Sequence, residues 1–108
     1  MFIGKVVGTV VATVKDPKVA ALPLQVVQEL DEHNRARNRY LVAADTIGAG
    51  LGDLVLCVQG SSARQTSATD GRPIDAAIFA IIDSWDVDGS EVYSKEGLET
   101  FARQPAES

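Results

Sequence analysis

The chain has 108 residues, which is room for one domain with a modest core. Hydrophobic residues make up 45% of the chain but aromatic residues only 6%, so valine, isoleucine, leucine and alanine are expected to fill the core. The net charge of −5 repels phosphate backbones, and few rings are available to stack on bases, so no nucleic acid is expected as a partner.

The apolar pattern predicts five β-strands in chain order. A first strand is expected over residues 2–14, because every second residue from Gly4 to Val14 is small or apolar and would form one face. Residues 24–30 are expected to form the second strand, although their spacing also suits a helix. The remaining predicted strands lie at residues 39–46, 54–58 and 74–82, with a short sixth strand around residues 91–93.

Short strands joined by glycine-rich turns, with no helix between them, predict an all-β fold, namely a small five-stranded barrel. A doubly wound α/β fold would need crossover helices, and the sequence has none. After the strands, Ser94 is expected to cap a short C-terminal helix.

The segment Ile74–Ile82 is apolar at both its even and its odd positions, so a strand there would bury both faces. Because the chain offers almost no helix as cover, we expect another copy of the same protein to cover the second face. Phe79 and Trp85 are interpreted as core or interface anchors. This strand therefore predicts an assembly subunit.

The charge is unevenly distributed. Residues 1–82 carry eight acidic and eight basic residues, whereas residues 83–108 carry seven acidic residues and two basic ones. A neutral body with an acidic tail fits a subunit that packs against neighbours, and an ordinary solvated C-terminus fits as well.

Cys57 is the only cysteine and lies in an apolar segment, which predicts a small buried side chain in a reducing compartment. No apolar run reaches the roughly 20 residues of a membrane span. The N-terminus lacks the basic start and the cleavage site of a signal peptide. A cytoplasmic protein that binds no membrane is therefore expected.

The segment from Gly48 to Asp53 is similar to a dinucleotide-binding fingerprint, but position 53 is aspartate instead of the third glycine, and a strand follows instead of a helix. A tight loop is the better interpretation, in which the absence of side chains lets the backbone come close to a neighbouring group.

Two hydroxyls in the segment Gly60–Arg64 suggest a nucleophile, but the only available base is His33, which lies in a polar turn. A triad with Asp45 or Asp75 is the alternative, and it demands a specific geometry. The aspartates beside the strands match no metal-loop spacing. We therefore expect no catalytic, cofactor or metal site.

Five segments, taken together and in order, resemble the pentameric vertex proteins of bacterial microcompartment shells. They are Gly8–Thr13, Lys15–Pro17, Ala44–Asp53, Gly60–Arg64 and Arg72–Ala76. The resemblance runs from Phe2 to Lys95, and Glu91–Lys95 is most similar to the carboxysome members. The segment Ala21–Leu24 differs from many relatives, which have a glycine and then a basic or polar residue before the second strand.

The resemblance implies an oligonucleotide-binding-like (OB-like) barrel, a cyclic homopentamer and no enzyme activity. It also implies hexameric shell proteins as partners, in a cytoplasmic microcompartment shell. Residues 1–95 would form the barrel domain, and residues 96–108 an acidic helix or tail. The main expectation is a carboxysome, which serves carbon dioxide fixation in photosynthesis. The alternatives are an ethanolamine- or propanediol-type catabolic microcompartment and, from another class, a small-ligand-binding barrel.

The resemblance also implies two sets of site residues. The shell-contact loop, facing hexameric tiles, would comprise Gly48, Ala49, Gly50, Leu51, Gly52 and Asp53. The subunit interface and central pore would involve Gly60, Ser61, Ser62, Ala63, Arg64, Asp75 and Phe79. The ligand-binding alternative would use Ser61, Ser62 and Arg64.

Overall fold

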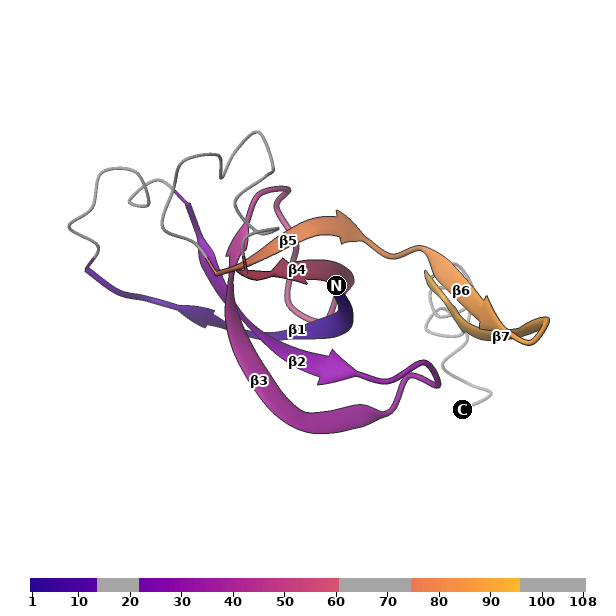
Figure 1. Ribbon diagram of the computed structural model, residues 1–108. Helices are drawn as coiled ribbons and strands as arrows, with labels where there is room; N and C mark the ends of the chain where they lie inside the picture. The colour runs from indigo at the N-terminus through magenta and orange to yellow at the C-terminus, as the bar shows by residue number, and fades with distance from the viewer. Residues whose placement is uncertain (14–21, 61–74, 96–108) are drawn as a thin grey trace, which may run out of the picture.

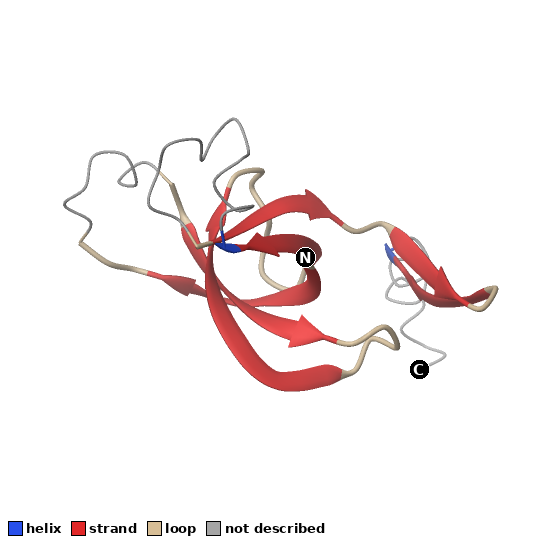
Figure 2. Cartoon of the chain, viewed as in Figure 1, coloured by secondary structure: helices blue, strands red, loops and turns tan. Residues whose placement is uncertain are grey.

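The computed structural model describes residues 1–13, 22–60 and 75–95 (Figure 1). Seven strands lie in these ranges, and Figure 2 shows that strands dominate the fold. They are β1 (Phe2–Val10), β2 (Leu24–Leu30), β3 (Ala36–Asp45), β4 (Leu54–Gln59), β5 (Ala76–Ile81), β6 (Ser84–Val87) and β7 (Ser90–Ser94). The predicted all-β fold is confirmed.

Strands β1 to β5 close a barrel in the order β1-β2-β3-β5-β4, and β6 pairs with β7 in a separate two-stranded sheet. All neighbouring strands are antiparallel except β3 and β5, which are parallel. The predicted five-stranded barrel is therefore confirmed, and residues 24–30 form a strand instead of a helix. The β6 strand was not predicted, and the helix expected after Ser94 falls mostly in residues 96–108, outside the described ranges.

A β-bulge in β1 corrects the predicted face of the first strand. Val6 pairs with Val27 and Gly8 pairs with Val26, so Val7 is an extra residue without a partner of its own in β2. One extra residue reverses the alternation of a strand. Gly4 and Val6 consequently face the barrel interior, whereas Gly8 follows Val26 onto the outer surface. The expected single apolar face from Gly4 to Val14 was wrong, and the strand ends at Val10.

A second bulge explains why the segment at β5 is apolar in both registers. Cys57 pairs with Ile78 and Leu56 pairs with Ala80, so Phe79 is the extra residue. Before the bulge the inward positions are even, and after it they are odd, because Ile81 packs against the same core as Ile78. This change of register is one reason for the two-sided pattern, and the burial of Ala77 on the other face is a second.

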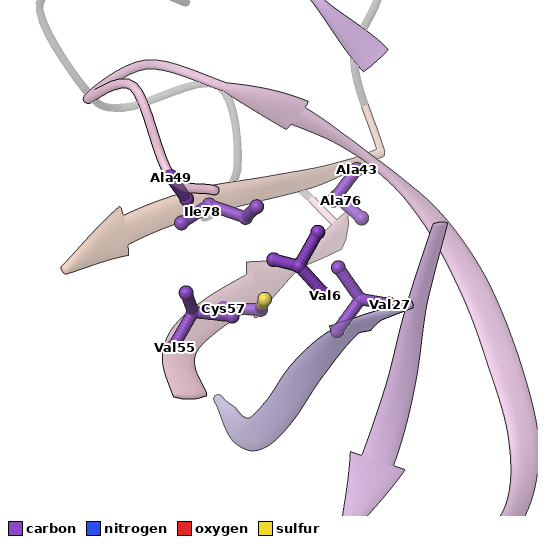
Figure 3. Close-up of a cluster of buried hydrophobic side chains, with 8 residues drawn as sticks. All are labelled: Val6, Val27, Ala43, Ala49, Val55, Cys57, Ala76 and Ile78. Atoms are coloured by element: carbon purple, nitrogen blue, oxygen red, sulfur yellow. The ribbon is translucent and has the colours of Figure 1, made fainter. Parts of the chain in front are cut away.

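Every strand of the barrel contributes to the interior core. Figure 3 shows side chains from β1 to β5, together with one loop residue, converging on the same space. The cluster comprises Val6, Val27, Ala43, Ala49, Val55, Cys57, Ala76 and Ile78. Small residues fit because a barrel of five strands leaves little internal room.

The outer face of the barrel is partly covered by the chain itself. Ala77 is fully buried beneath Leu22 and Leu24. Ile82 is buried in a separate apolar cluster, against which Trp85 packs. Trp85 and Tyr93 belong to the β6–β7 hairpin, and their ring centroids lie 5.4 Å apart. The expectation that a second copy must cover the other face of β5 was therefore wrong for these two positions.

The β2–β3 turn is closed by one carboxylate. Asp31 Oδ1 accepts the backbone N–H groups of His33 and Arg35, each at 2.9 Å, and Asn34 adopts a φ of 62°. The Arg35 hydrogen bond is the largest cause that lowers the pKa of Asp31. This compact turn lets β3 begin at Ala36, three residues before the predicted start. Trp85 Nε1 donates to the Glu32 carbonyl oxygen at 2.9 Å, which ties the hairpin to the turn.

Candidate functional site

The glycine-rich loop, residues 46–53, connects β3 to β4 and begins at a buried carboxylate. Asp45 is only 5% exposed, and its Oδ1 accepts the backbone N–H groups of Ile47 at 3.1 Å and Gly48 at 2.9 Å. Aspartate commonly closes turns in this way, by accepting from N–H groups two or three residues on. The side chain at the end of β3 therefore fixes the first half of the glycine-rich loop.

A buried glutamine from β2 holds the middle of the loop. Gln25 Nε2 donates to Asp45 Oδ2 at 3.3 Å and to the Ala49 carbonyl oxygen at 3.2 Å. Its Oε1 accepts the hydroxyl of Thr9 at 3.0 Å. Gln25 is 8% exposed, so its amide is satisfied within the protein. One side chain thus links β1, β2, the end of β3 and the loop.

The second half of the loop is fixed by Asp53 and by β1. Asp53 Oδ2 accepts the Gly50 N–H at 2.8 Å, and the Asp53 N–H donates back to the Gly50 carbonyl at 3.1 Å. Gly52 N–H donates to the Val6 carbonyl at 2.8 Å. Gly48 and Gly52 have φ values of 78° and 88°, a region that favours glycine. The glycines thus serve the loop's own geometry at these two positions.

The loop presents few side chains to its surroundings. Ala49 is 6% exposed and belongs to the interior core, so its methyl group anchors the loop instead of contacting a neighbour. Leu51 is 77% exposed and Ile47 is 43% exposed. The glycine-rich loop therefore displays two apolar side chains, whereas its Thr46 hydroxyl donates to the Ile78 carbonyl oxygen at 2.7 Å and its Asp53 carboxylate accepts from Gly50.

Two of the predicted interface residues lie together. The Gly60 N–H donates to the Asp75 carbonyl oxygen at 2.7 Å, where β4 ends and β5 is about to begin. Phe79 lies further along β5, at the bulge, and is half-buried. Ser61, Ser62, Ala63 and Arg64 lie outside the described residues.

The residues weighed for a catalytic triad are not assembled in the described ranges. The Asp45 carboxylate is occupied by two backbone N–H groups and by Gln25. His33 is exposed, and its Nε2 lies 3.8 Å from Glu32 Oε1. Within residues 1–13, 22–60 and 75–95, no group of three or more potential metal ligands comes together.

Cys57 is fully buried in the core, as predicted. Burial raises the pKa of its thiol to about 12, which keeps the thiol protonated and unreactive near neutral pH. In the described part of the chain, no helix is long and apolar enough to cross a membrane.

Glu29 is a third buried polar residue of the barrel, after Gln25 and Asp45. Glu29 accepts from Arg37 Nη1 at 3.4 Å and from Arg39 Nη1 at 3.2 Å. The concavity beside it is also lined by Asp31 and Glu32, so the acidic and basic side chains nearly balance. This balance favours a structural role over selection of a charged ligand.

Sequence reasoning missed Gln25 and Thr9. The available signal was the alternation of β2, in which a glutamine occupies the same register as the core residue Val27. A polar side chain in an inward register needs partners. Only the three-dimensional arrangement shows that the partners of Gln25 are Thr9 in β1, Asp45 at the end of β3 and Ala49 in the glycine-rich loop.

The fold and the loop together define a class: a small closed β-barrel whose glycine-rich loop is fixed by hydrogen bonds within the subunit. Residues 1–83 match the family described as ethanolamine utilisation protein EutN/carboxysome. The chain belongs to this EutN/CcmL family.

Relatives extend the match beyond those residues. The chain is 47% identical to the carboxysome shell vertex protein CcmL of Synechococcus elongatus, over 88% of this chain and 96% of that protein. The solved structure of Gloeobacter violaceus CcmL superposes with a TM-score of 0.84 at 43% identity, over 89% of this chain and 99% of the other. GrpN of Rhodospirillum rubrum, a pentameric microcompartment shell protein, gives a TM-score of 0.74 at 40% identity, over 81% and 99%. The predicted resemblance to microcompartment vertex proteins is confirmed.

Proposed function

We propose that this chain is a structural protein that forms homopentamers and caps the vertices of a carboxysome shell. The observation that carries the proposal is the similarity to CcmL, at 47% identity over nearly the whole of that protein. The pentameric GrpN structure, which has the same fold, supports five copies around an axis. This role requires no enzyme activity, and it places the protein in the shell of a cytoplasmic compartment.

The proposal assigns two surfaces. The glycine-rich loop faces the neighbouring hexameric shell proteins through Gly48–Asp53. The segment Gly60–Arg64, with Asp75 and Phe79, lies at the subunit interface and around the central pore. The backbone hydrogen bond between Gly60 and Asp75 supports grouping these two residues in one surface, because it places them side by side. Residues 1–95 act as the folded unit, and residues 96–108 as an acidic tail.

A carboxysome is favoured over a catabolic microcompartment. Identity to the S. elongatus carboxysome protein is 47% over 88% of the chain, compared with 36% over the same share for the microcompartment shell vertex protein EutN of Salmonella typhimurium. The ligand-binding alternative requires Ser61, Ser62 and Arg64 to bind a small molecule. Substituting each of these residues separates the two classes: loss of assembly supports the structural role, and intact assembly with loss of ligand binding supports the alternative.

Native mass spectrometry of the purified protein tests the proposal directly. Five subunits of 11.5 kDa predict a complex of about 57 kDa. Mixing that complex with a hexameric carboxysome shell protein should then give closed particles, visible by electron microscopy, whereas the hexamers alone should give sheets or tubes. A monomer at all concentrations, or particles that form equally well without this protein, would contradict the proposed role.

A further inference from the structure

The glycine-rich loop, residues 46–53, is held at three independent points. Asp45 fixes its start, Asp53 fixes its end through Gly50, and the Ala49 methyl group is inserted in the core. These contacts involve the loop and its own barrel only. The conformation of the loop is therefore determined by the subunit, before any neighbour is present.

Gln25 lies outside the loop, on β2, and its side chain bonds to the loop backbone from the barrel interior. Its amide nitrogen bridges Asp45 Oδ2 and the Ala49 carbonyl, at 3.3 and 3.2 Å. The Thr9 hydroxyl fixes which end of the amide faces the loop, because it donates to Oε1 at 3.0 Å. Without that amide, a buried carboxylate oxygen and a buried carbonyl would lose their donor.

The side chains that the loop displays are apolar. Leu51 is 77% exposed, because its neighbours Gly50 and Gly52 have no side chains that could cover it. Ile47 is 43% exposed on the same loop. A rigid loop with a projecting leucine and little side-chain bulk beside it matches a partner that offers a small apolar pocket and a closely approaching backbone.

We infer that Leu51 and Ile47 are the anchors of the shell contact and that Gln25 is its positioning residue. This inference rests on the proposed function, which supplies the occupant: the edge of a hexameric shell protein. Leu51 enters an apolar pocket on the hexamer, and Gln25 acts from inside the barrel by holding the loop in the conformation that presents Leu51.

The anchor role is tested with Leu51→Ala, compared with Val42→Ala as the matched control. Both side chains are exposed aliphatic groups, and Val42 is 52% exposed on β3, outside the loop. Binding of each variant to an immobilised hexameric carboxysome shell protein is measured by biolayer interferometry. Leu51→Ala should weaken binding by about tenfold or more, as expected for one buried leucine side chain, while Val42→Ala should stay within about twofold.

The positioning role is tested with Gln25→Met, which keeps the length of the side chain and removes its hydrogen bonds. Hydrogen–deuterium exchange should speed up in the peptide that covers residues 46–53 and stay unchanged in β2 and β4. Binding to the hexamer should weaken while the pentamer mass is retained. Gln25→Leu provides a second variant, should methionine impair folding. Unchanged exchange of the loop would overturn the positioning role.

The outcomes separate the two proposals. A wild-type pentamer that does not bind the hexamer overturns the proposed function and this inference together. Equal binding by wild type, Leu51→Ala and Gln25→Met overturns the inference alone. A pentamer that Leu51→Ala dissociates into monomers also overturns it, because the loop would then contact a second copy of this chain.

Discussion

Gly4 is the position at which one added methyl group should disturb the barrel most. Gly4 is buried in β1, between its partners Glu29 and Val55. A Cβ atom there would overlap Val27 Cγ1 and would lie 3.2 Å from the Gln28 carbonyl oxygen. Neither neighbour yields easily, because Val27 is fully buried and the carbonyl belongs to the sheet.

The size of the effect follows from three contributions. Overpacking a core by one methyl group costs about 1–3 kcal/mol, and the contact with main chain places Gly4→Ala near the upper value. The lower entropy of the unfolded alanine chain offsets about 0.5–1 kcal/mol. We therefore expect Gly4→Ala to lower the free energy of unfolding by about 2 kcal/mol. Val27→Ala alone should cost about 2–3 kcal/mol, through lost burial and the cavity left behind.

The double variant provides the decisive measurement. In Gly4→Ala/Val27→Ala the new methyl group occupies the space that the Val27 methyl groups leave, so the two costs should largely cancel. The expected loss is about 1–2 kcal/mol instead of the roughly 4–5 kcal/mol of two independent changes, a coupling within the range seen for contacting residues. Guanidinium unfolding followed by circular dichroism, at one fixed subunit concentration, measures each value.

Gly8→Ala serves as the control in the same strand. Beyond the Val7 bulge, its Cβ atom would meet only Val26, at 3.7 and 3.8 Å, which is ordinary contact. Its unfolding free energy should stay within about 0.5 kcal/mol of wild type. Additivity of the Gly4 and Val27 changes, or equal costs at Gly4 and Gly8, would refute the register derived from the bulge.

Four further predictions test other parts of the molecule. Gly48→Ala should destabilise the protein by about 1–2 kcal/mol, because the φ of Gly48 is 78°. Gly50→Ala should change stability by less than about 0.5 kcal/mol, because the added Cβ atom would meet only Asp53 Oδ2, at 3.6 Å. Thermal unfolding of the two variants measures the difference. Phe79→Asp should dissociate the pentamer, and a variant that keeps the mass of a pentamer would remove Phe79 from the interface. The Cys57 thiol, whose pKa rises from 9.0 to about 12, should react with a maleimide at pH 8 at least about a thousandfold more slowly in the folded protein than in guanidinium, because both its thiolate fraction and its access are reduced. Stability should fall above about pH 9, since the unfolded thiol ionises there and the buried one does not.

The strands were predictable because their signal is local. Residues 24–30 and 54–58 alternate or run apolar with the period of a strand, and glycines or polar residues separate them. The bulges were not predictable, because an extra residue is defined only by the strand opposite it. Val7 and Phe79 look like ordinary members of their strands until Val26 and Leu56 are seen beside them. Hence the predicted face of β1 was wrong although the strand was right, whereas β5 starts with residues buried on both faces, as predicted.

The position of the candidate loop was predictable from the sequence, but the contacts that fix its conformation were not. Its glycines and the family resemblance located residues 48–53, yet Ala49 turned out to be a core residue and the important amide came from Gln25, more than 20 residues earlier. β6 was missed for a similar reason. Ser84–Val87 alternates weakly, and its strand character depends on the pairing of Trp85 with Tyr93.

The loop network matters for assembly because of the relative size of two free energies. Burying one exposed leucine contributes about 2–3 kcal/mol. Ordering the backbone of a flexible segment costs about 1–2 kcal/mol per residue. If residues 46–53 were flexible, the cost of ordering them on binding would therefore exceed the free energy gained by burying Leu51. A contact built on so small an anchor is favourable only when the loop is already ordered. The loop is ordered when the subunit folds, through the hydrogen bonds of Asp45, Gln25 and Asp53. The free energy of burying Leu51 and Ile47 can then stabilise association with a neighbour.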